Sequence, residues 1–288
     1  AKVDKKLKAV DLQLKKLKQN TASSTNLHPL LSRINTIYRN TILSTIPNKL
    51  PVILINEYPK SGGTWLGQMV SDVLNIDFPR NNFPSIRPSI FHGHYLNDFN
   101  VKKKIIVWRD GRDIMVSWYY HCLFPNEHGS ERLVKISRKN LQFDDYEDIY
   151  KNLPQFIEYA FTSQPFPSFS WSEFFDHWFQ RKNTVHVKYE HLNQNPVDEL
   201  YRIIKEITGE KPRIEIVRST VEKFSFEKLT KRKKGHEKKN SFLRKGIIGD
   251  WKNNFSTSAC ETFSGLANKA LINLGYEKNE DWASRLTS

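Results

Sequence analysis

The sequence predicts an α/β domain with a central, mostly parallel sheet flanked by helices. Three short apolar segments, 52–55, 104–108 and 184–189, have the composition of buried strands. Each is followed by a segment with apolar residues at helical spacing, and this alternation is typical of a parallel sheet covered on both faces. Because ligands of such sheets bind at the carboxyl ends of the strands, the loops after these segments are the first candidates for a site.

Length and composition indicate a globular protein. Of 288 residues, 38% are hydrophobic and 12% aromatic, enough to fill a core. No stretch reaches the run of about 18 apolar residues that a membrane span needs, and the N-terminus lacks a signal-peptide core. With two cysteines and no zinc spacing, we expect a reducing, cytoplasmic setting. The chain begins at Ala1, so removal of a targeting segment is left open.

The formal net charge of +14 favours anionic partners. Nucleic acid, an anionic membrane surface and a polyanionic small molecule are all partners that a positively charged protein can bind. The choice among them therefore depends on the chemistry of the loops.

Residues 1–20 are predicted to form a separate amphipathic helix. Its apolar residues form a heptad seam with lysines on the other faces, at Val3, Leu7, Val10, Leu14 and Leu17. Three interpretations stay open: a helix docked on the domain, a short coiled coil, and a basic helix in peripheral contact with a membrane. The segment 21–45 is expected to hold a polar linker and a second helix over about 28–45.

The most informative segment follows the first predicted strand and reads Tyr58-Pro59-Lys60-Ser61-Gly62-Gly63-Thr64-Trp65. A helix is predicted directly after it, to about residue 74. The order of strand, glycine-containing loop and helix collects backbone N–H groups, a helix N-terminus and one lysine around a single point. This segment therefore predicts a site for a phosphate-like anion.

The other predicted strands end in groups of matching chemistry. The second is followed by Arg109, with Ser117 eight residues further on, near the start of the expected helix. The third ends at Tyr189, and a helix is predicted over 196–208. An arginine can bind a phosphate through two parallel hydrogen bonds, and an aromatic ring can stack on a base.

A strongly basic segment, 228–245, contains nine Lys and Arg residues and one acid, Glu237. A solvated loop and an anion-binding lid are both compatible with this composition. The lid is favoured because two cations stand next to a glycine that permits close approach of the backbone to a ligand, in Arg244-Lys245-Gly246. The segment continues as Ile247-Ile248-Gly249-Asp250-Trp251-Lys252-Asn253.

Together, these three blocks resemble those of the soluble sulfotransferases that use 3′-phosphoadenosine 5′-phosphosulfate (PAPS), whose desulfated product is PAP. The similarity spans about residues 50–275, and it implies a single P-loop-kinase-like domain over 46–288. It implies that Lys60 contacts the 5′-phosphate and the leaving oxygen, and that His94 is the catalytic base. By the same resemblance Ser117 contributes to both catalysis and cofactor binding. The remaining implied cofactor-binding residues are Ser61, Gly62, Gly63, Thr64, Trp65, Arg109, Tyr189, Phe226, Arg244, Lys245 and Gly246.

The chain departs from the family pattern at three places. Gly63 stands where the family usually has threonine, so one hydroxyl near the 5′-phosphate is lost. His92 stands where many members have a lysine near the sulfuryl group, and it is an alternative to His94 as the base. The dimer motif that often follows the lid is matched only loosely, which leaves the oligomeric state open.

The expected reaction is an in-line displacement at sulfur. A neutral histidine accepts the acceptor's proton, while a lysine stabilises charge on the leaving oxygen, and no metal is expected. The expected acceptor is a small molecule or glycan with a hydroxyl or amine, and nucleic acid is not an expected partner. Two alternatives are a nucleotide kinase with a divergent phosphate loop, and a basic nucleic-acid-binding or membrane-binding module.

Overall fold

The computed structural model describes residues 28–45, 52–80, 82, 87–127 and 131–284. Its centre is a four-stranded parallel sheet in the order β2-β1-β3-β4. The strands are β1 (Val52–Glu57), β2 (Ser89–Gly93), β3 (Lys103–Trp108) and β4 (Thr184–Lys188). The predicted α/β fold is thus confirmed. Since all four strands run in the same direction, their carboxyl ends lie at one edge of the sheet.

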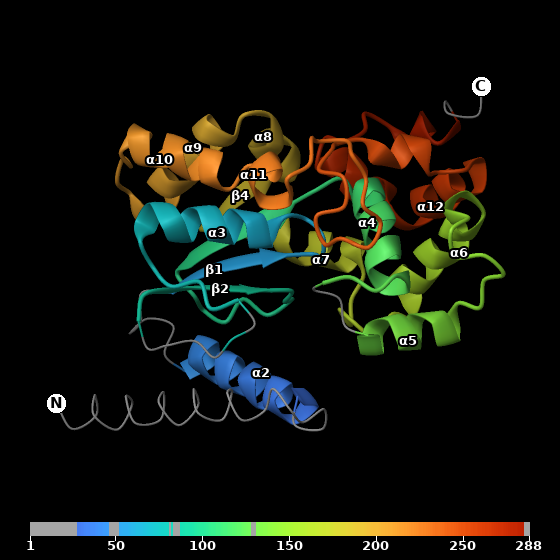
Figure 1. The fold of residues 1–288 in the computed structure, drawn as a ribbon, viewed down its shortest axis with the longest axis horizontal. Coiled ribbons are helices and arrows are strands. Elements are labelled where there is room, and N and C mark those ends of the chain that lie inside the picture. The colour runs from blue at the N-terminus through green and yellow to red at the C-terminus, as the bar shows by residue number, and fades with distance from the viewer. Residues whose placement is uncertain (1–27, 46–51, 81, 83–86, 128–130, 285–288) are drawn as a thin grey trace.

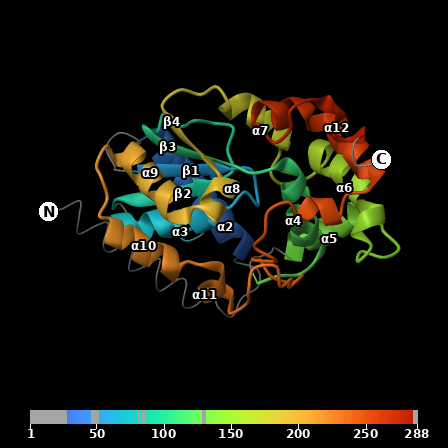
Figure 2. The ribbon, with the colours of Figure 1, turned by 90° about the horizontal axis from the view of Figure 1, so that it is seen from above.

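Helices cover both faces of this sheet (Figures 1 and 2). The helices of this group are α2 (His28–Thr45), α3 (Gly63–Leu74), α8 (Tyr189–Gln194), α9 (Pro196–Thr208) and α10 (Ile214–Lys223), and the short helix α11 (Phe226–Thr230) lies next to α10. In β1, Ile53 and Ile55 pack on the side of α3 and α9, while Leu54 packs on the side of α2. This two-residue alternation, with every residue of β1 buried, explains why the strand is almost entirely apolar.

A second group of helices extends from the carboxyl edge of the sheet (Figure 1). It contains α4 (Gly111–Leu123), α5 (Glu131–Asn140), α6 (Ile149–Thr162), α7 (Trp171–Trp178) and α12 (Thr257–Asn273), with the short helices η2 (Asp250–Asn253) and η3 (Glu280–Trp282). Its core is rich in buried rings, among them Trp118, Trp171 and Phe263. Burial of each such side chain contributes roughly 1.5–3 kcal/mol, so this aromatic core holds α4 rigidly beside the sheet.

Buried charges fix the start of α4 to the C-terminal part of the chain. Asp110 caps the N-terminus of α4 and binds Arg112 through both oxygens, at 3.0 and 2.8 Å. The guanidinium of Arg112 lies over the ring of Trp251, 3.8 Å from its centroid, and also binds Glu277. Asp113 accepts the backbone N–H groups of Gly249 and Trp251, at 2.7 and 2.9 Å. The segment around 249–253 is therefore fixed against the start of α4.

Most predicted elements match the structure, with two exceptions. The helix expected over about 28–45 is α2, and the helix expected over 196–208 is α9. Strand β2 is not among the predicted strands, and Tyr189 begins α8 instead of ending β4. The helix predicted for 1–20 lies outside the described residues. In the part of the chain that the structure describes, no helix is both long enough and apolar enough to cross a membrane.

Candidate functional site

The loop between β1 and α3 has the backbone of an anion-binding loop. Lys60 and Gly62 have positive φ angles of 72° and 99°, and Gly62 is the N-cap of α3. A Cβ atom at Gly62 would lie 2.7 Å from the ring of Tyr189, so this position requires glycine for both its conformation and its contact. The buried Ser61 hydroxyl has no hydrogen-bond partner among the described residues. The loop thus presents an unused hydroxyl beside the N-terminus of a helix.

The side chain of Lys60 extends from this loop to Phe242 in the basic segment 228–245. Its ammonium is 3.7 Å from the centroid of the Phe242 ring and donates to the Phe242 carbonyl at 3.3 Å. Burial, followed by the nearby charge of Arg109, lowers the pKa of Lys60 to about 7. An anion beside Lys60 would favour its charged form, so this lysine is poised to gain a proton when an anion binds.

Arg109 follows β3 and supports the loop from the other side. It donates to the backbone carbonyl of Lys60 at 2.8 Å, and its guanidinium lies 4.4 Å from the centroid of the Tyr189 ring. Its buried Nε atom has no hydrogen-bond partner within the described ranges. An anion bound here would supply the acceptor that Nε lacks.

Ser117 and Arg109 line one cavity, whose full lining is given below. The expected place of Ser117 near the start of a helix is wrong. It is the seventh residue of α4, which begins at Gly111. Because the effect of the helix dipole is limited to the first turn, the dipole adds nothing at Ser117. Its hydroxyl remains available as a donor to a ligand.

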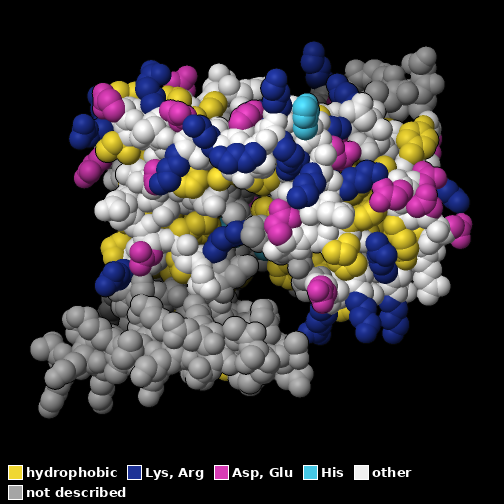
Figure 3. Space-filling view, viewed as in Figure 1, with side chains coloured by type: hydrophobic (Ala, Val, Ile, Leu, Met, Phe, Trp, Pro, Cys, Tyr) yellow, Lys and Arg dark blue, Asp and Glu magenta, His cyan; other side chains and the backbone are white. Residues whose placement is uncertain are grey.

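The basic segment 228–245 lies over the cavity, as the lid interpretation predicts. Lys and Arg side chains gather on the face that carries α11 and the loop after it (Figure 3). Arg232 donates to the backbone carbonyls of His236 and Arg244, so its charge supports the shape of the loop. In total, the cations of this segment that line the cavity are Arg232, Lys234, Lys238, Arg244 and Lys245.

The two cations at the end of the lid are held by carboxylates. Asp250 pairs with both Arg244 and Lys245, and Arg244 also pairs with Glu237. Burial alone would raise the pKa of Asp250, but its bonds to Lys245 and Arg244 hold that pKa below its ordinary value. The pairs fix the direction of both cations, and Glu237 competes with any anion for Arg244.

Aromatic rings form the opposite end of the cavity. The indole of Trp65 donates to the carbonyl of Phe224 at 2.8 Å and meets the ring of Tyr189 edge to face, with centroids 6.2 Å apart. The ring of Phe226 would lie 2.6 Å from a Cβ atom at Gly246, which has a φ of 69°. The lid glycine therefore lets the backbone pass directly over this ring.

These groups surround a cavity of about 490 Å³, within the roughly 300–1,000 Å³ typical of small-molecule sites. It joins a cationic end at Lys60, Arg109 and the lid to an aromatic end. The predicted residues that line it are Lys60, Gly62, Thr64, Trp65, Arg109, Ser117, Tyr189, Phe226, Arg244, Lys245 and Gly246. The predicted Ser61, Gly63 and His94 are not among the residues that line it. An adenosine with two phosphate groups has the chemistry that such a cavity accommodates.

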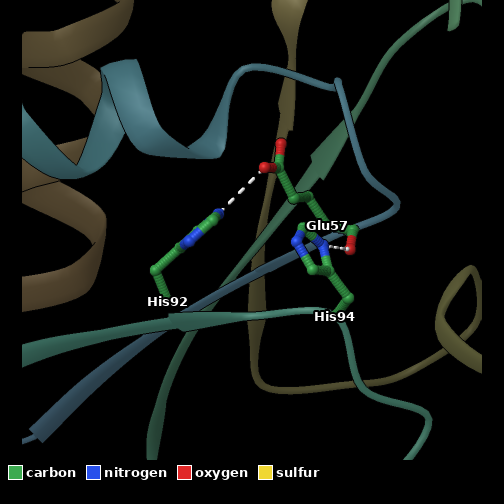
Figure 4. Close-up of side chains that lie close together, drawn as sticks. All are labelled: Glu57, His92 and His94. Carbon is green, nitrogen blue, oxygen red and sulfur yellow. Dashed lines mark hydrogen bonds and ion pairs between the residues drawn. The ribbon is translucent and has the colours of Figure 1, made fainter. Parts of the chain in front are cut away.

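His94 and His92 meet at the end of β1 (Figure 4). The Nδ1 atom of His94 lies 2.9 Å from the backbone carbonyl of Glu57, and the Nε2 atom of His92 lies 2.9 Å from the Glu57 carboxylate. Burial, followed by the charge of His92, lowers the pKa of His94 to about 4. Nitrogen and oxygen atoms of the three residues lie within 4.8 Å of one another, and these hydrogen bonds account for the contacts.

Three residues of the site were not predicted from the sequence. Glu57 is a buried acid at the end of a strand that begins with four apolar residues, a signal that could have identified it. Phe242 covers Lys60, and Asp250 orients the lid cations. Neither contact could be predicted from the spacing of residues in the sequence, because each depends on the path of the segment 228–250 over the cavity.

Comparison with known proteins identifies a family and relatives for this chain. Residues 81–275 match the family described as "Sulfotransferase domain". The chain is 26% identical over 269 residues to mouse sulfotransferase 1B1, covering 76% of this chain and 82% of that protein. It is 24% identical over 257 residues to human sulfotransferase 1E1, covering 73% and 80%.

Solved structures share the fold. Mouse sulfotransferase SULT7A1, crystallised with PAP, aligns with a TM-score of 0.59 and 18% identity, over 87% of this chain and 93% of that one. A retinol dehydratase in complex with androsterone and PAP aligns with a TM-score of 0.52 and 15% identity, over 82% and 84%.

Proposed function

Because this chain belongs to the sulfotransferase family and is a PAPS-dependent enzyme, we propose that it transfers the sulfuryl group from PAPS to a hydroxyl or amine in the cavity described above. The single observation that supports this proposal most is the pair of unpartnered buried polar atoms, Ser61 Oγ in the loop between β1 and α3 and Arg109 Nε beside that loop. Buried polar atoms of this kind are normally satisfied, so an anionic ligand completes them.

Two cationic positions would hold the two phosphate-bearing ends of the nucleotide. The loop at Lys60, Ser61 and Thr64 would receive the 5′ end, where backbone N–H groups and a helix N-terminus favour negative charge. Arg109, Ser117 and the lid residues Arg244 to Gly246 would receive the 3′-phosphate. The rings of Trp65, Tyr189 and Phe226 would take the base between them.

Sulfuryl transfer needs a proton acceptor and a stabiliser of the leaving oxygen. His94 would serve as the base, because its Nδ1 atom faces a carbonyl and therefore carries the hydrogen, which leaves the lone pair on Nε2. Its low pKa keeps the ring neutral at physiological pH. Lys60 would donate to the leaving oxygen, where negative charge develops. His92 is the alternative base, but its Nε2 atom already meets the Glu57 carboxylate.

Neither alternative function gains support from the site. A nucleotide kinase does not account for membership of the sulfotransferase family. The basic segment that suggested a nucleic-acid-binding or membrane-binding module contributes its cations to the cavity instead. A peripheral membrane role for residues 1–20, and the division of the chain at residues 20 and 45, remain predictions.

A transfer assay tests the proposed function. The enzyme is incubated with PAPS carrying ³⁵S and with pools of alcohols, phenols, amines and sugars, and labelled products are separated. We expect a labelled product from at least one pool, and its loss in Lys60→Ala. The matched control is Lys211→Ala, because Lys211 is an exposed lysine after α9. Product formation that persists in Lys60→Ala would contradict the role of Lys60.

A further inference from the structure

A buried acid stands where the sheet meets the phosphate loop. Glu57 is the last residue of β1, lines the cavity and is 3% exposed. Its carboxylate binds two groups: the Nε2 atom of His92 at 2.9 Å and the backbone N–H of Gly63 at 2.5 Å. Its backbone carbonyl binds His94 (Figure 4). One residue therefore contacts both histidines and the start of α3.

Gly63 provides the space for this carboxylate. A Cβ atom at Gly63 would lie 2.7 Å from the carboxyl carbon of Glu57 and 3.0 Å from each of its oxygens. Unlike Gly62, Gly63 has no positive φ, so its backbone does not itself require glycine. The reason for glycine at this position is therefore the acid in β1.

A negative charge on Glu57 must be neutralised by a positive charge if an anion is to bind nearby. Burial alone would raise the pKa of Glu57, but the hydrogen bond and the charge of His92 hold it below its ordinary value, so the carboxylate is ionised. An unpaired carboxylate would repel a sulfuryl group at the end of the cavity. The Nε2 atom of His92, 2.9 Å from this carboxylate, is the group in position to cancel its charge.

The other groups around this pair are consistent with such a balance. His94 lies next to His92 on the same strand segment, with ring centroids 5.3 Å apart, and is neutral. Lys60, in the loop, also interacts electrostatically with Glu57. The ring of Phe78, from the segment after α3, packs edge to face against His92 at 6.3 Å.

We propose that Glu57 is a positioning residue for the sulfuryl transfer: its carboxylate holds His92 as an imidazolium at the cavity end, and its carbonyl fixes the tautomer of His94. This inference rests on the proposed function for its catalytic meaning. The structural part, an ion pair between Glu57 and His92, does not depend on it. In this arrangement His92 supplies a positive charge and the neutral His94 supplies a base, although the two residues are only two positions apart.

Nuclear magnetic resonance tests the ion pair directly. The nine histidines are labelled with ¹⁵N, and the His92 signals are assigned by their loss in His92→Gln. At pH 7 we expect a doubly protonated His92 ring in the wild type and a singly protonated ring in Glu57→Gln, which has the same shape without the charge. His94 should carry its proton on Nδ1. The same protonation of His92 in both proteins would overturn the proposal, whether or not the enzyme transfers sulfate.

Kinetics test the positioning role. In Glu57→Gln we expect kcat to fall at least tenfold while the dissociation constant of PAP changes less than about threefold, with the exposed Glu210→Gln as control. An unchanged kcat would refute the role of Glu57 in catalysis. Loss of wild-type activity with EDTA and its return with Zn²⁺ would show instead that the three side chains bind a metal.

A double-mutant cycle tests the link to the loop. Gly63→Ala should lower kcat in the wild type, because the new methyl group displaces the carboxylate. The same change should have little further effect in Glu57→Ala, where the space is free. Additive effects of the two substitutions would contradict the assignment of Gly63. If the wild type shows no transfer from PAPS at all, the proposed function fails, while the resonance experiment still decides the ion pair.

Discussion

Binding of PAP should be accompanied by proton uptake at Lys60. With a pKa of about 7 in the empty site, Lys60 is mostly neutral above that pH. A phosphate beside it favours the charged form, so the bound complex holds a proton that the free protein lacks. If the bound pKa returns towards its ordinary value, uptake is ~0.1 proton at pH 6, ~0.5 at pH 7 and ~0.9 at pH 8. The phosphates of PAP ionise near pH 6 and contribute little at pH 8.

The same linkage sets the pH dependence of affinity. Since the bound state carries the extra proton, the affinity for PAP should weaken as pH rises, by about tenfold per unit well above pH 7. Calorimetry in two buffers with different ionisation enthalpies measures the uptake, and Lys60→Met should abolish it while Lys211→Ala retains it. Proton uptake near zero at pH 8 in the wild type would refute the claim that Lys60 is mostly uncharged at this pH in the protein without PAP.

Three further outcomes are expected. Gly62→Ala should weaken PAP binding at least tenfold, as measured by calorimetry, and Gly209→Ala should not. Both glycines have a positive φ, but nothing lies within 4 Å of a Cβ atom at Gly209. Arg112→Ala should lower the free energy of unfolding by about 3–5 kcal/mol in urea denaturation, because it leaves buried carboxylates unpaired, while the exposed Arg213→Ala should change it by less than ~0.5 kcal/mol. The His94 base is active when unprotonated, so on the acidic side kcat/KM should not fall until pH drops to about 4; an acidic midpoint near 6.5 would argue against the buried, neutral ring.

Local patterns predicted the central part of this fold. The apolar strand β1, the loop at 58–62 and helix α3 are contiguous in sequence, so their order is visible without tertiary information. Helix α9 was also predicted with its observed bounds, since proline begins it and glycine follows it.

Contacts between distant segments could not be predicted in the same way. The pairing of Glu57 with His92 joins residues 35 positions apart, and Asp113 receives N–H groups from the segment 136 to 138 positions later. Strand β2 was missed because it is short and contains a histidine and a glycine. The placement of Ser117 was wrong because α4 begins three residues before the expected helix start at Ile114.

The most direct test of the central claim is a crystal structure of the wild-type protein with PAP. We expect the 5′-phosphate at Lys60 and Ser61, the 3′-phosphate within hydrogen-bond distance of Arg109, and the adenine among the rings of Trp65 and Phe226. Electron density for the nucleotide at any other surface, or a 3′-phosphate remote from Arg109, would contradict it.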